Sequence, residues 1–318
     1  MSPSFTTPVT IVPLQEPPGY HQQWFTLGSC FSENIGRRLT QAGFNTCVNP
    51  FGVLFNPLSI SRSVKRLLGN TLVAEKELFL HGSVWNHYDF SNLHSGVDRQ
   101  TTLLEMNKAI TDASEQFQQA GVLMITFGTS WIYEARQTGE VVANCHKLPA
   151  NQFIRRRLTV NEIVDEYSKL LSTLPPGMRV IFTVSPVRHW KDGAHENTLS
   201  KSVLHLAIDE LINLFPSYAY FPAYELVLDE LRDYRYFTDD MVHPSDLAVD
   251  YVWQQFINFG FSTHTRTIIR EVEDFRRMQQ HRSIHPDSDE HKAFLRKREL
   301  QQEELLKKYP FLTLSTDK

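Results

Sequence analysis

The stretch WFTLGSCFS, residues 24–32, decides the fold that we expect for this chain. Its first four residues have strand character, and they run directly into Gly28 and Ser29. Apolar residues then recur at helical spacing, and residues 44–48 form a second strand-like run. The sequence therefore predicts a strand, a tight turn, a helix and a second strand, in that order, close to the start of the chain.

The same alternation of strands and helices continues to residue 221. We expect helices over residues 58–68, 101–119, 159–174 and 196–215, and strands over residues 122–127, 179–184 and 218–221. Two of these strands are continuously apolar, which is typical of parallel strands that helices cover on both faces. The predicted fold class is α/β, with a flavodoxin-like, three-layer α/β/α parallel sheet whose site lies at the carboxyl ends of the strands.

Two internal segments and the end of the chain depart from this alternation. Residues 73–95 and 131–147 are rich in aromatic and turn residues, and we expect inserted hairpins that wall a substrate cleft. From residue 264 onward, charges of both signs surround apolar positions at helical spacing. We therefore expect an α/β domain, residues 1–263, and a charged helical C-terminal extension, residues 264–318, which packs on the domain or on a second copy as a homo-oligomer.

The composition excludes several classes of protein. The chain has 318 residues, 41% hydrophobic and 21% charged, as in ordinary globular proteins. A net charge of −4 gives no broad basic face for nucleic acid or for an anionic membrane. Three distant cysteines form neither a disulfide framework nor a zinc ribbon. With no signal-peptide pattern, long apolar run or phosphate-binding glycine motif, we expect a cytoplasmic protein without a membrane partner or cofactor.

Two motifs carry candidate chemistry. Ser29 follows a strand at a predicted helix start, where N–H groups favour an anionic intermediate. A serine nucleophile needs a base that a third group orients. Asp240 and His243 are three residues apart, so that Asp240 can hold Nδ1 of the imidazole while Nε2 faces the serine. Pro244 is then expected to begin the next helix. Each motif also has a common structural explanation, a helix cap for the serine and chance for the Asp-x-x-His spacing.

Five strings together resemble the GSCFA family over about residues 20–262. They are GSCFS at residues 28–32, FGVLFNP at 51–57, FGTSWIY at 127–133, VSPVRHW at 184–190 and DDMVHPS at 239–245. That family is similar to the SGNH, or GDSL-like, hydrolases. The resemblance implies a serine hydrolase or acyltransferase that acts on an ester, such as a carbohydrate O-acetyl ester or another small acyl ester. It implies a triad of Ser29, His243 and Asp240 and an acyl-serine intermediate.

The same resemblance points to residues for an oxyanion hole. Gly52 matches the glycine whose backbone N–H serves the hole in such hydrolases. The next block normally reads G-x-N, but this chain has Ser130 in place of the asparagine. Either Ser130 substitutes for the missing amide, or Asn144 reaches the site from the following hairpin. The loss of one oxyanion donor typically lowers the rate by about 10²-fold to 10³-fold.

Several alternatives remain open at the level of the sequence. Cys30 adjoins Ser29 at the helix start and is a second candidate nucleophile. His87 and Arg188 are candidate substrate-binding residues in loops at the functional end, although a surface salt bridge explains Arg188 equally well. The clustered histidines lack partners at zinc-like spacing, so we expect no metal. The alternative to an enzyme is a non-catalytic member of the fold that serves binding or assembly.

Overall fold

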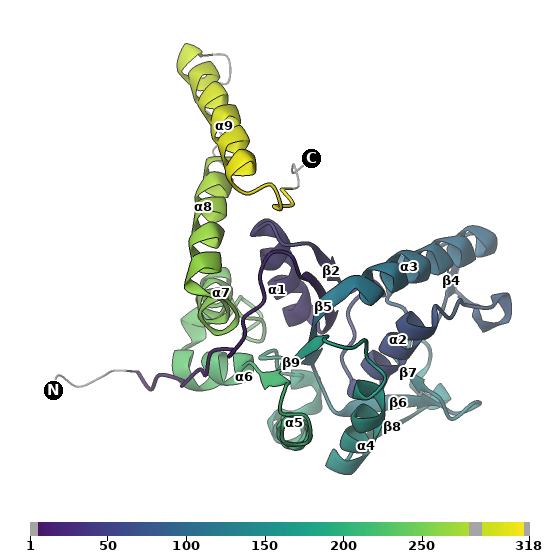
Figure 1. Cartoon of the computed structure of the whole chain (residues 1–318). Helices are drawn as coiled ribbons and strands as arrows, with labels where there is room; N and C mark the ends of the chain where they lie inside the picture. The colour runs from purple at the N-terminus through teal and green to yellow at the C-terminus, as the bar shows by residue number, and fades with distance from the viewer. Residues whose placement is uncertain (1–5, 280–287, 315–318) are drawn as a thin grey trace.

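A five-stranded parallel sheet forms the centre of the molecule. The computed structural model describes residues 6–279 and 288–314 (Figure 1). The sheet order is β2-β1-β5-β9-β10, with every pair parallel. The strands are β1 (Gln23–Gly28), β2 (Thr46–Val48), β5 (Ala120–Phe127), β9 (Arg179–Val184) and β10 (Ala219–Tyr220). The predicted α/β class and flavodoxin-like order are confirmed.

Helices cover both faces of the sheet, because successive side chains of each strand point to opposite sides. Trp24 of β1 belongs to one apolar core and Phe25 to the other. The first core is closed by α1 (Cys30–Gln41), α7 (Asp246–Gly260) and α8 (Thr263–Gln279). The second is closed by α2 (Pro57–Gly69), α3 (Arg99–Gln119), α4 (Val160–Leu171) and α5 (Ala194–Leu214). The predicted three layers are therefore present.

The path of the chain changes direction at β1. From β1 the chain crosses to β2 through α1 on one face of the sheet. It then returns past β1 to β5 through α2 and α3 on the opposite face. Where two successive crossovers lie on opposite faces of a parallel sheet, a crevice forms at the carboxyl ends of the strands where the chain changes direction. The turn with Gly28 and Ser29 lies at this point.

The expected hairpins are present, although the sequence patterns did not predict all of their strands. β3 (Phe79–His81) pairs with β4 (Val84–Asn86), and β6 (Trp131–Ala135) pairs with β7 (Val141–Val142) and β8 (Phe153–Arg157). β8 was not predicted, since its three consecutive arginines depart from the apolar and aromatic composition typical of strands. Short helical segments connect the main elements: η1 (Glu75–Glu77), η2 (Asn92–His94), η3 (Ala150–Gln152), η4 (Trp190–Asp192), α6 (Ala223–Glu225), η5 (Leu226–Leu231) and η6 (Tyr234–Tyr236).

The expected start of α7 at Pro244 is wrong. The helix begins at Asp246, because the Ser245 side chain accepts a hydrogen bond from the Ala248 N–H and acts as the cap. Pro244 instead forms an isolated bridge with Phe237. The residue after the Asp-x-x-His motif therefore belongs to a loop.

The C-terminal helices pack on the α/β domain. α8 buries Ile268, Ile269 and Val272 in the same core as Trp253 of α7. Beyond α9 (Asp289–Lys308) the chain returns to the domain, where the Thr313 N–H donates to the carbonyl of Gly43 at 3.0 Å. Contacts of the described residues after 263 with α1, α7 and Gly43 are therefore present, and the division into a domain and an extension stays a prediction. None of the helices in the described ranges is long and apolar enough to cross a membrane.

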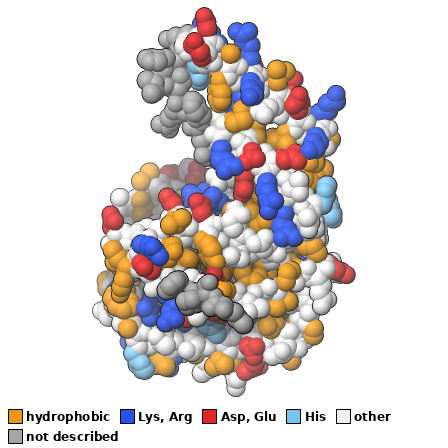
Figure 2. All heavy atoms as spheres, turned by 90° about the vertical axis from the view of Figure 1, so that its left-hand side faces the viewer, with side chains coloured by type: hydrophobic (Ala, Val, Ile, Leu, Met, Phe, Trp, Pro, Cys, Tyr) orange, Lys and Arg blue, Asp and Glu red, His pale blue; other side chains and the backbone are white. Residues whose placement is uncertain are grey.

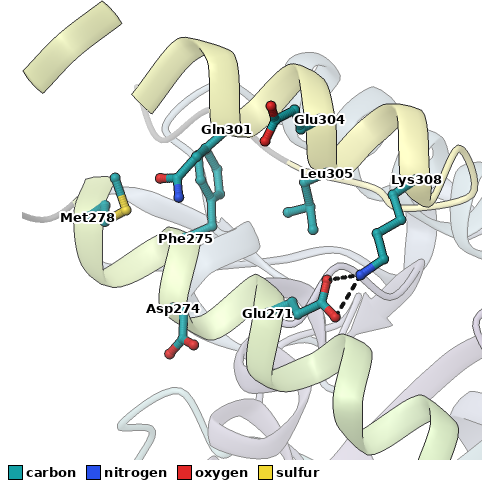
Figure 3. A pocket seen from close by; sticks show the side chains of 8 residues that line it. All are labelled: Glu271, Asp274, Phe275, Met278, Gln301, Glu304, Leu305 and Lys308. Atoms are coloured by element: carbon teal, nitrogen blue, oxygen red, sulfur yellow. Dashed lines mark hydrogen bonds and ion pairs between the residues drawn. The ribbon is translucent and has the colours of Figure 1, made fainter. Parts of the chain in front are cut away.

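α8 and α9 form an arm beside the domain (Figure 1). In Figure 2, basic and acidic side chains mix over its surface, so this view shows no patch of a single charge sign. A groove of about 350 Å³ separates the two helices (Figure 3). Phe275 and Leu305 line it, and Lys308 closes one end through an ion pair with Glu271 at 2.8 Å. Pairing with a second copy through this arm stays a prediction.

We predict that α8 is an integral part of the core. Ile269→Ala should lower the free energy of unfolding by about 2–5 kcal/mol, because it leaves a cavity at a fully buried position. Leu300→Ala on α9 is the control: its side chain is 60% exposed, and we expect a change below about 0.5 kcal/mol. Chemical denaturation measures both. Equal, small losses would contradict the placement of α8 in the core.

Candidate active site

Ser29 lies between the end of β1 and the first residue of α1. Its Oγ accepts a hydrogen bond from the Phe31 N–H at 3.3 Å, so that the side chain caps the helix. Its own N–H donates to the carbonyl of Thr126 at the long distance of 3.4 Å. The side chain is buried, with 1% of the residue exposed. The helix N-terminus places partial positive charge beside the hydroxyl.

Only glycine fits immediately before this serine. Gly28 has φ +140°, and a Cβ there would lie 2.2 Å from the carbonyl oxygen of Thr126 in β5. Its N–H donates to Asn49 Oδ1 at 2.9 Å, and its carbonyl accepts from the Leu54 N–H. The turn is therefore held on one side by β5 and on the other by the segment after β2.

The surroundings of Cys30 do not activate its thiol as a nucleophile. Burial raises the pKa of its thiol above the ordinary value, although hydrogen bonding from the Phe31 N–H acts in the opposite direction. Reactive cysteines show the reverse, a lowered pKa that populates the thiolate at neutral pH. The local environment thus favours Ser29 over Cys30.

Asp240 and His243 form a hydrogen-bonded pair. Asp240 Oδ2 lies 2.6 Å from His243 Nδ1, and Asp240 Oδ1 accepts from the backbone N–H groups of Val242 and His243. The Thr238 hydroxyl also donates to this carboxylate. Together these hydrogen bonds, the one from the His243 N–H first, hold the pKa of Asp240 well below its ordinary value. The carboxylate stays ionised and engages Nδ1, which leaves Nε2 for a reacting group.

Lys201 is a residue of this edge that the sequence patterns did not indicate. It belongs to α5 and is 2% exposed, and its Nζ donates to the carbonyls of Gly128 and Ser185, both at 2.7 Å. These carbonyls directly follow β5 and β9. Burial lowers the pKa of Lys201 to about 7, while the nearby Cys30 thiol acts in the opposite direction. A buried cation therefore joins two strand ends close to the Ser29 turn.

The pKa of His189, in the loop after β9, depends on its burial and on both Lys201 and His243. Burial lowers the pKa of His189 to about 4, and the positive charges of Lys201 and, less strongly, of His243 act in the same direction. The Asp240 loop borders the same groove as Arg188 and Trp190, which follow β9. Within the described residues no hydrogen bond joins His243 to Ser29, so the complete triad stays a prediction.

Gly52 is a turn residue with a special backbone conformation. Its φ is +79°, and a Cβ there would lie 2.0 Å from the Ser91 Oγ, so that glycine is required. Its N–H donates to the carbonyl of Asn49 at 2.8 Å. An oxyanion would have to compete with this hydrogen bond for the predicted donor.

Ser130 and Asn144, the alternatives for the third oxyanion donor, both have partners inside the protein. The N–H and the Oγ of Ser130 lie 2.9 Å and 3.1 Å from the Ser200 Oγ. Asn144 Nδ2 donates to Asn92 Oδ1 at 3.3 Å, and Asn144 Oδ1 accepts from the His146 N–H at 2.8 Å. Which of the two donates to an oxyanion stays a prediction.

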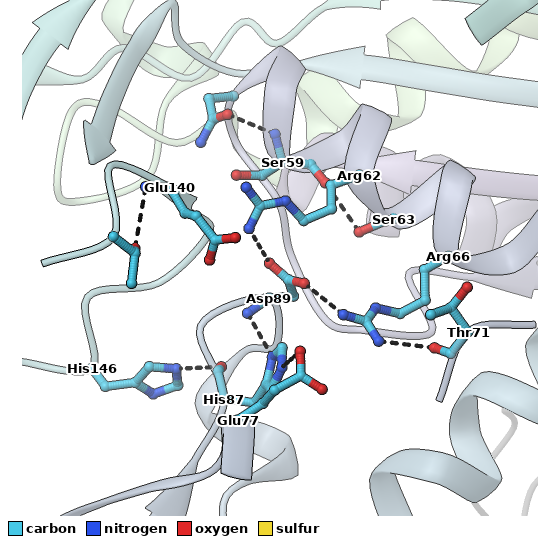
Figure 4. Close-up of polar contacts among 12 residues, drawn as sticks. Ser59, Arg62, Ser63, Arg66, Thr71, Glu77, His87, Asp89, Glu140 and His146 are labelled. Carbon is cyan, nitrogen blue, oxygen red and sulfur yellow. Dashed lines mark hydrogen bonds and ion pairs between the residues drawn. The ribbon is translucent and has the colours of Figure 1, made fainter. Parts of the chain in front are cut away.

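His87 belongs to a buried polar cluster (Figure 4). Its Nδ1 accepts from the Asp89 N–H at 3.0 Å, and its Nε2 lies 3.9 Å from a Glu77 oxygen. Asp89 forms ion pairs with Arg62 and Arg66 of α2 at 3.1 Å and 3.0 Å. Burial lowers the pKa of His87. The Asp89 carboxylate thus ties the loop after β4 to α2, and contact of the His87 ring with substrate stays a prediction.

Arg188 lines a groove beside Asp240. The groove has a volume of about 510 Å³, and its wall includes Trp190 and Tyr234, which are 55% and 77% exposed. The Arg188 guanidinium lies 5.3 Å from the Trp190 ring centroid, and its Nε is buried without a hydrogen-bond partner.

Within the described ranges, no group of three or more His, Cys, Asp or Glu side chains is arranged to hold a metal ion.

We predict that Lys201 makes stability depend on pH. Between its folded pKa of about 7 and its unfolded value of 10.5, only the unfolded chain is protonated there, so stability rises with pH. From pH 7 to pH 9, wild type should gain on the order of 1–3 kcal/mol of unfolding free energy relative to Lys201→Met. Urea denaturation at both pH values measures this difference. If the difference in unfolding free energy between wild type and Lys201→Met did not change with pH, the pKa of Lys201 would not be lowered in the folded protein.

The comparisons with known proteins agree with the motifs that this site contains. A family model described as the GSCFA family matches residues 23–256, which include the sheet, the Ser29 turn and the Asp240–His243 pair. A second model, described as GSCFA domain protein, C-terminal domain, matches residues 272–318. No curated protein matches the chain. Because the first model covers well over half of the sequence, the chain belongs to the GSCFA family.

Proposed function

We propose that this protein is a serine hydrolase or acyltransferase that cleaves an ester through an acyl-Ser29 intermediate. The observation that carries the proposal is the hydrogen bond of 2.6 Å between Asp240 and His243. A carboxylate on Nδ1 fixes the tautomer and the orientation of an imidazole that acts as a base through Nε2. The resemblance to SGNH hydrolases supports the same assignment.

The reaction follows from these roles. His243 Nε2 takes the Ser29 proton while Oγ attacks the ester carbonyl carbon, and the carbonyl electrons move to oxygen. The oxyanion collapses to the acyl-serine, and the alcohol leaves with the proton from His243. Water or a second hydroxyl group then attacks the acyl carbon with His243 again as the base, the bond from that carbon to Ser29 Oγ breaks, and His243 returns the proton to Oγ. Ser29 Oγ accepts a hydrogen bond from the Phe31 N–H, and its own O–H is still available to donate to Nε2.

The groove at Arg188 supports a carbohydrate ester as the substrate. Exposed aromatic rings present flat apolar surfaces with polar edges, which suit the faces of sugar rings. The guanidinium of Arg188, with its unpartnered Nε, suits an anionic or hydroxyl substituent. Water as the acyl acceptor gives an esterase, and a sugar hydroxyl gives an acyltransferase.

We predict that Ser29→Ala and His243→Ala each lower the kcat for a short p-nitrophenyl ester by about 10⁴-fold or more. The double variant should be no worse than either single variant, because triad members act as a unit. A fluorophosphonate probe should label wild type and fail to label Ser29→Ala. His264→Ala, which removes an exposed histidine of α8, is the matched control and should keep full activity.

The same experiment decides between the alternatives. A wild-type protein that neither labels nor turns over esters would favour a non-catalytic binding or assembly role. Loss of all labelling in Cys30→Ala, with labelling retained in Ser29→Ala, would move the nucleophile to Cys30. Additive losses in the double variant would argue against a shared mechanism.

A further inference from the structure

We propose that the Asn49 side chain donates a hydrogen bond from Nδ2 to the oxyanion of the acyl-transfer intermediate. The inference rests on the proposed function and names a donor that the motif correspondence does not assign. Asn49 is the first residue after β2, the strand that pairs with β1. It therefore lies at the carboxyl edge of the sheet, on the side of β1 away from β5.

Three hydrogen bonds hold Asn49 against the nucleophile turn. Its N–H donates to the carbonyl of Thr26 at 2.9 Å, and its carbonyl accepts from the Gly52 N–H at 2.8 Å. Its Oδ1 accepts from the Gly28 N–H at 2.9 Å. The side chain thus continues the pairing of β2 with β1 as far as the residue before Ser29. This arrangement fixes the orientation of the amide before any substrate binds.

The other end of the amide has no partner. Asn49 is 8% exposed, and its Nδ2 is buried without a hydrogen bond. Leaving a buried donor unpaired costs about 1–3 kcal/mol, so such groups call for a specific explanation. The residue also has φ +40°, a left-handed conformation that asparagine adopts more readily than most residues. A preorganised donor that waits for a charge formed only during reaction accounts for these features.

The remaining donors at this edge are less available. Gly52, Ser130 and Asn144 already donate to acceptors in the protein. The Ser29 N–H has only the bond of 3.4 Å to the Thr126 carbonyl and can be redirected. We therefore assign the Ser29 N–H and Asn49 Nδ2 as the two donors of the oxyanion hole. In this step Asn49 transfers no proton: it stabilises the negative charge that the carbonyl oxygen gains when Oγ attacks.

Asn197 provides a closely matched comparison. It is also buried, its Oδ1 accepts a backbone N–H at 2.9 Å, and its Nδ2 also has no partner. The backbone group that it binds is that of His189, in the loop after β9, whereas Asn49 binds the turn that carries the nucleophile. If an unpaired amide matters only for packing, Asn→Asp changes at the two positions should behave alike.

The test is Asn49→Asp beside Asn197→Asp in the full chain. Asn49→Asp keeps an oxygen for the Gly28 N–H and removes the Nδ2 donor. We expect kcat for a p-nitrophenyl ester to fall by about 10²-fold to 10³-fold or more, with KM changed less than about threefold. Asn197→Asp should stay within about threefold of wild type. The ratio of Asn49→Asp to wild-type kcat should rise as pH falls, because a protonated carboxyl group can donate.

The outcomes separate this inference from the proposed function. A wild type without turnover or labelling overturns both. An active wild type with an Asn49→Asp variant that folds and keeps its kcat overturns the inference alone. The same holds if the loss appears in Asn197→Asp, Ser130→Ala or Asn144→Ala instead. Should Asn49→Asp fail to fold, a crystal structure of the wild-type phosphonate adduct decides. A phosphoryl oxygen within about 3.1 Å of Asn49 Nδ2 would support the inference, and a longer distance would overturn it.

Discussion

The close approach of Gly28 to β5 is the constraint on which the candidate site depends. The missing side chain lets the Thr126 carbonyl lie where a Cβ would be, and the Ser29 N–H reaches the same oxygen. On the opposite side, Asn49 Oδ1 and the Leu54 N–H bond the two backbone groups of Gly28. The turn is thus held from both neighbouring strands. A serine in such a turn keeps its position when substrate binds, which preorganised catalysis requires.

The second feature of the edge is its buried positive charge. Lys201 bonds two backbone carbonyls, and within the described residues no ion pair joins its Nζ to a carboxylate. A buried ammonium in this setting is costly, and its pKa moves toward neutrality. Its charge also lowers the pKa of His189. When protonated, Lys201 therefore adds positive charge at this end of the sheet, in addition to that of the N-terminus of α1.

The two apolar cores, one on each face of the sheet, pack against different sets of helices. The core formed with α2, α3, α4 and α5 supports the strands that carry the loops of the site. The core formed with α1 and α7 is completed by α8, whose apolar stripe is buried although its other faces are highly charged. The described part of the C-terminal extension thus helps to stabilise α1, the helix that follows Ser29.

The order of elements and the position of Ser29 follow from the sequence alone, because hydrophobic periodicity and the strand, glycine, serine, helix pattern are local properties. The hydrogen bond from His243 Nδ1 to the Asp240 carboxylate follows from their spacing. The burial of Lys201, the unpartnered amide of Asn49 and the start of α7 at Asp246 were decided by the tertiary structure. Each of these depends on groups far apart in the chain, or on competition between neighbouring caps. No local pattern records which carbonyl a lysine will meet, or which donor will be left without a partner.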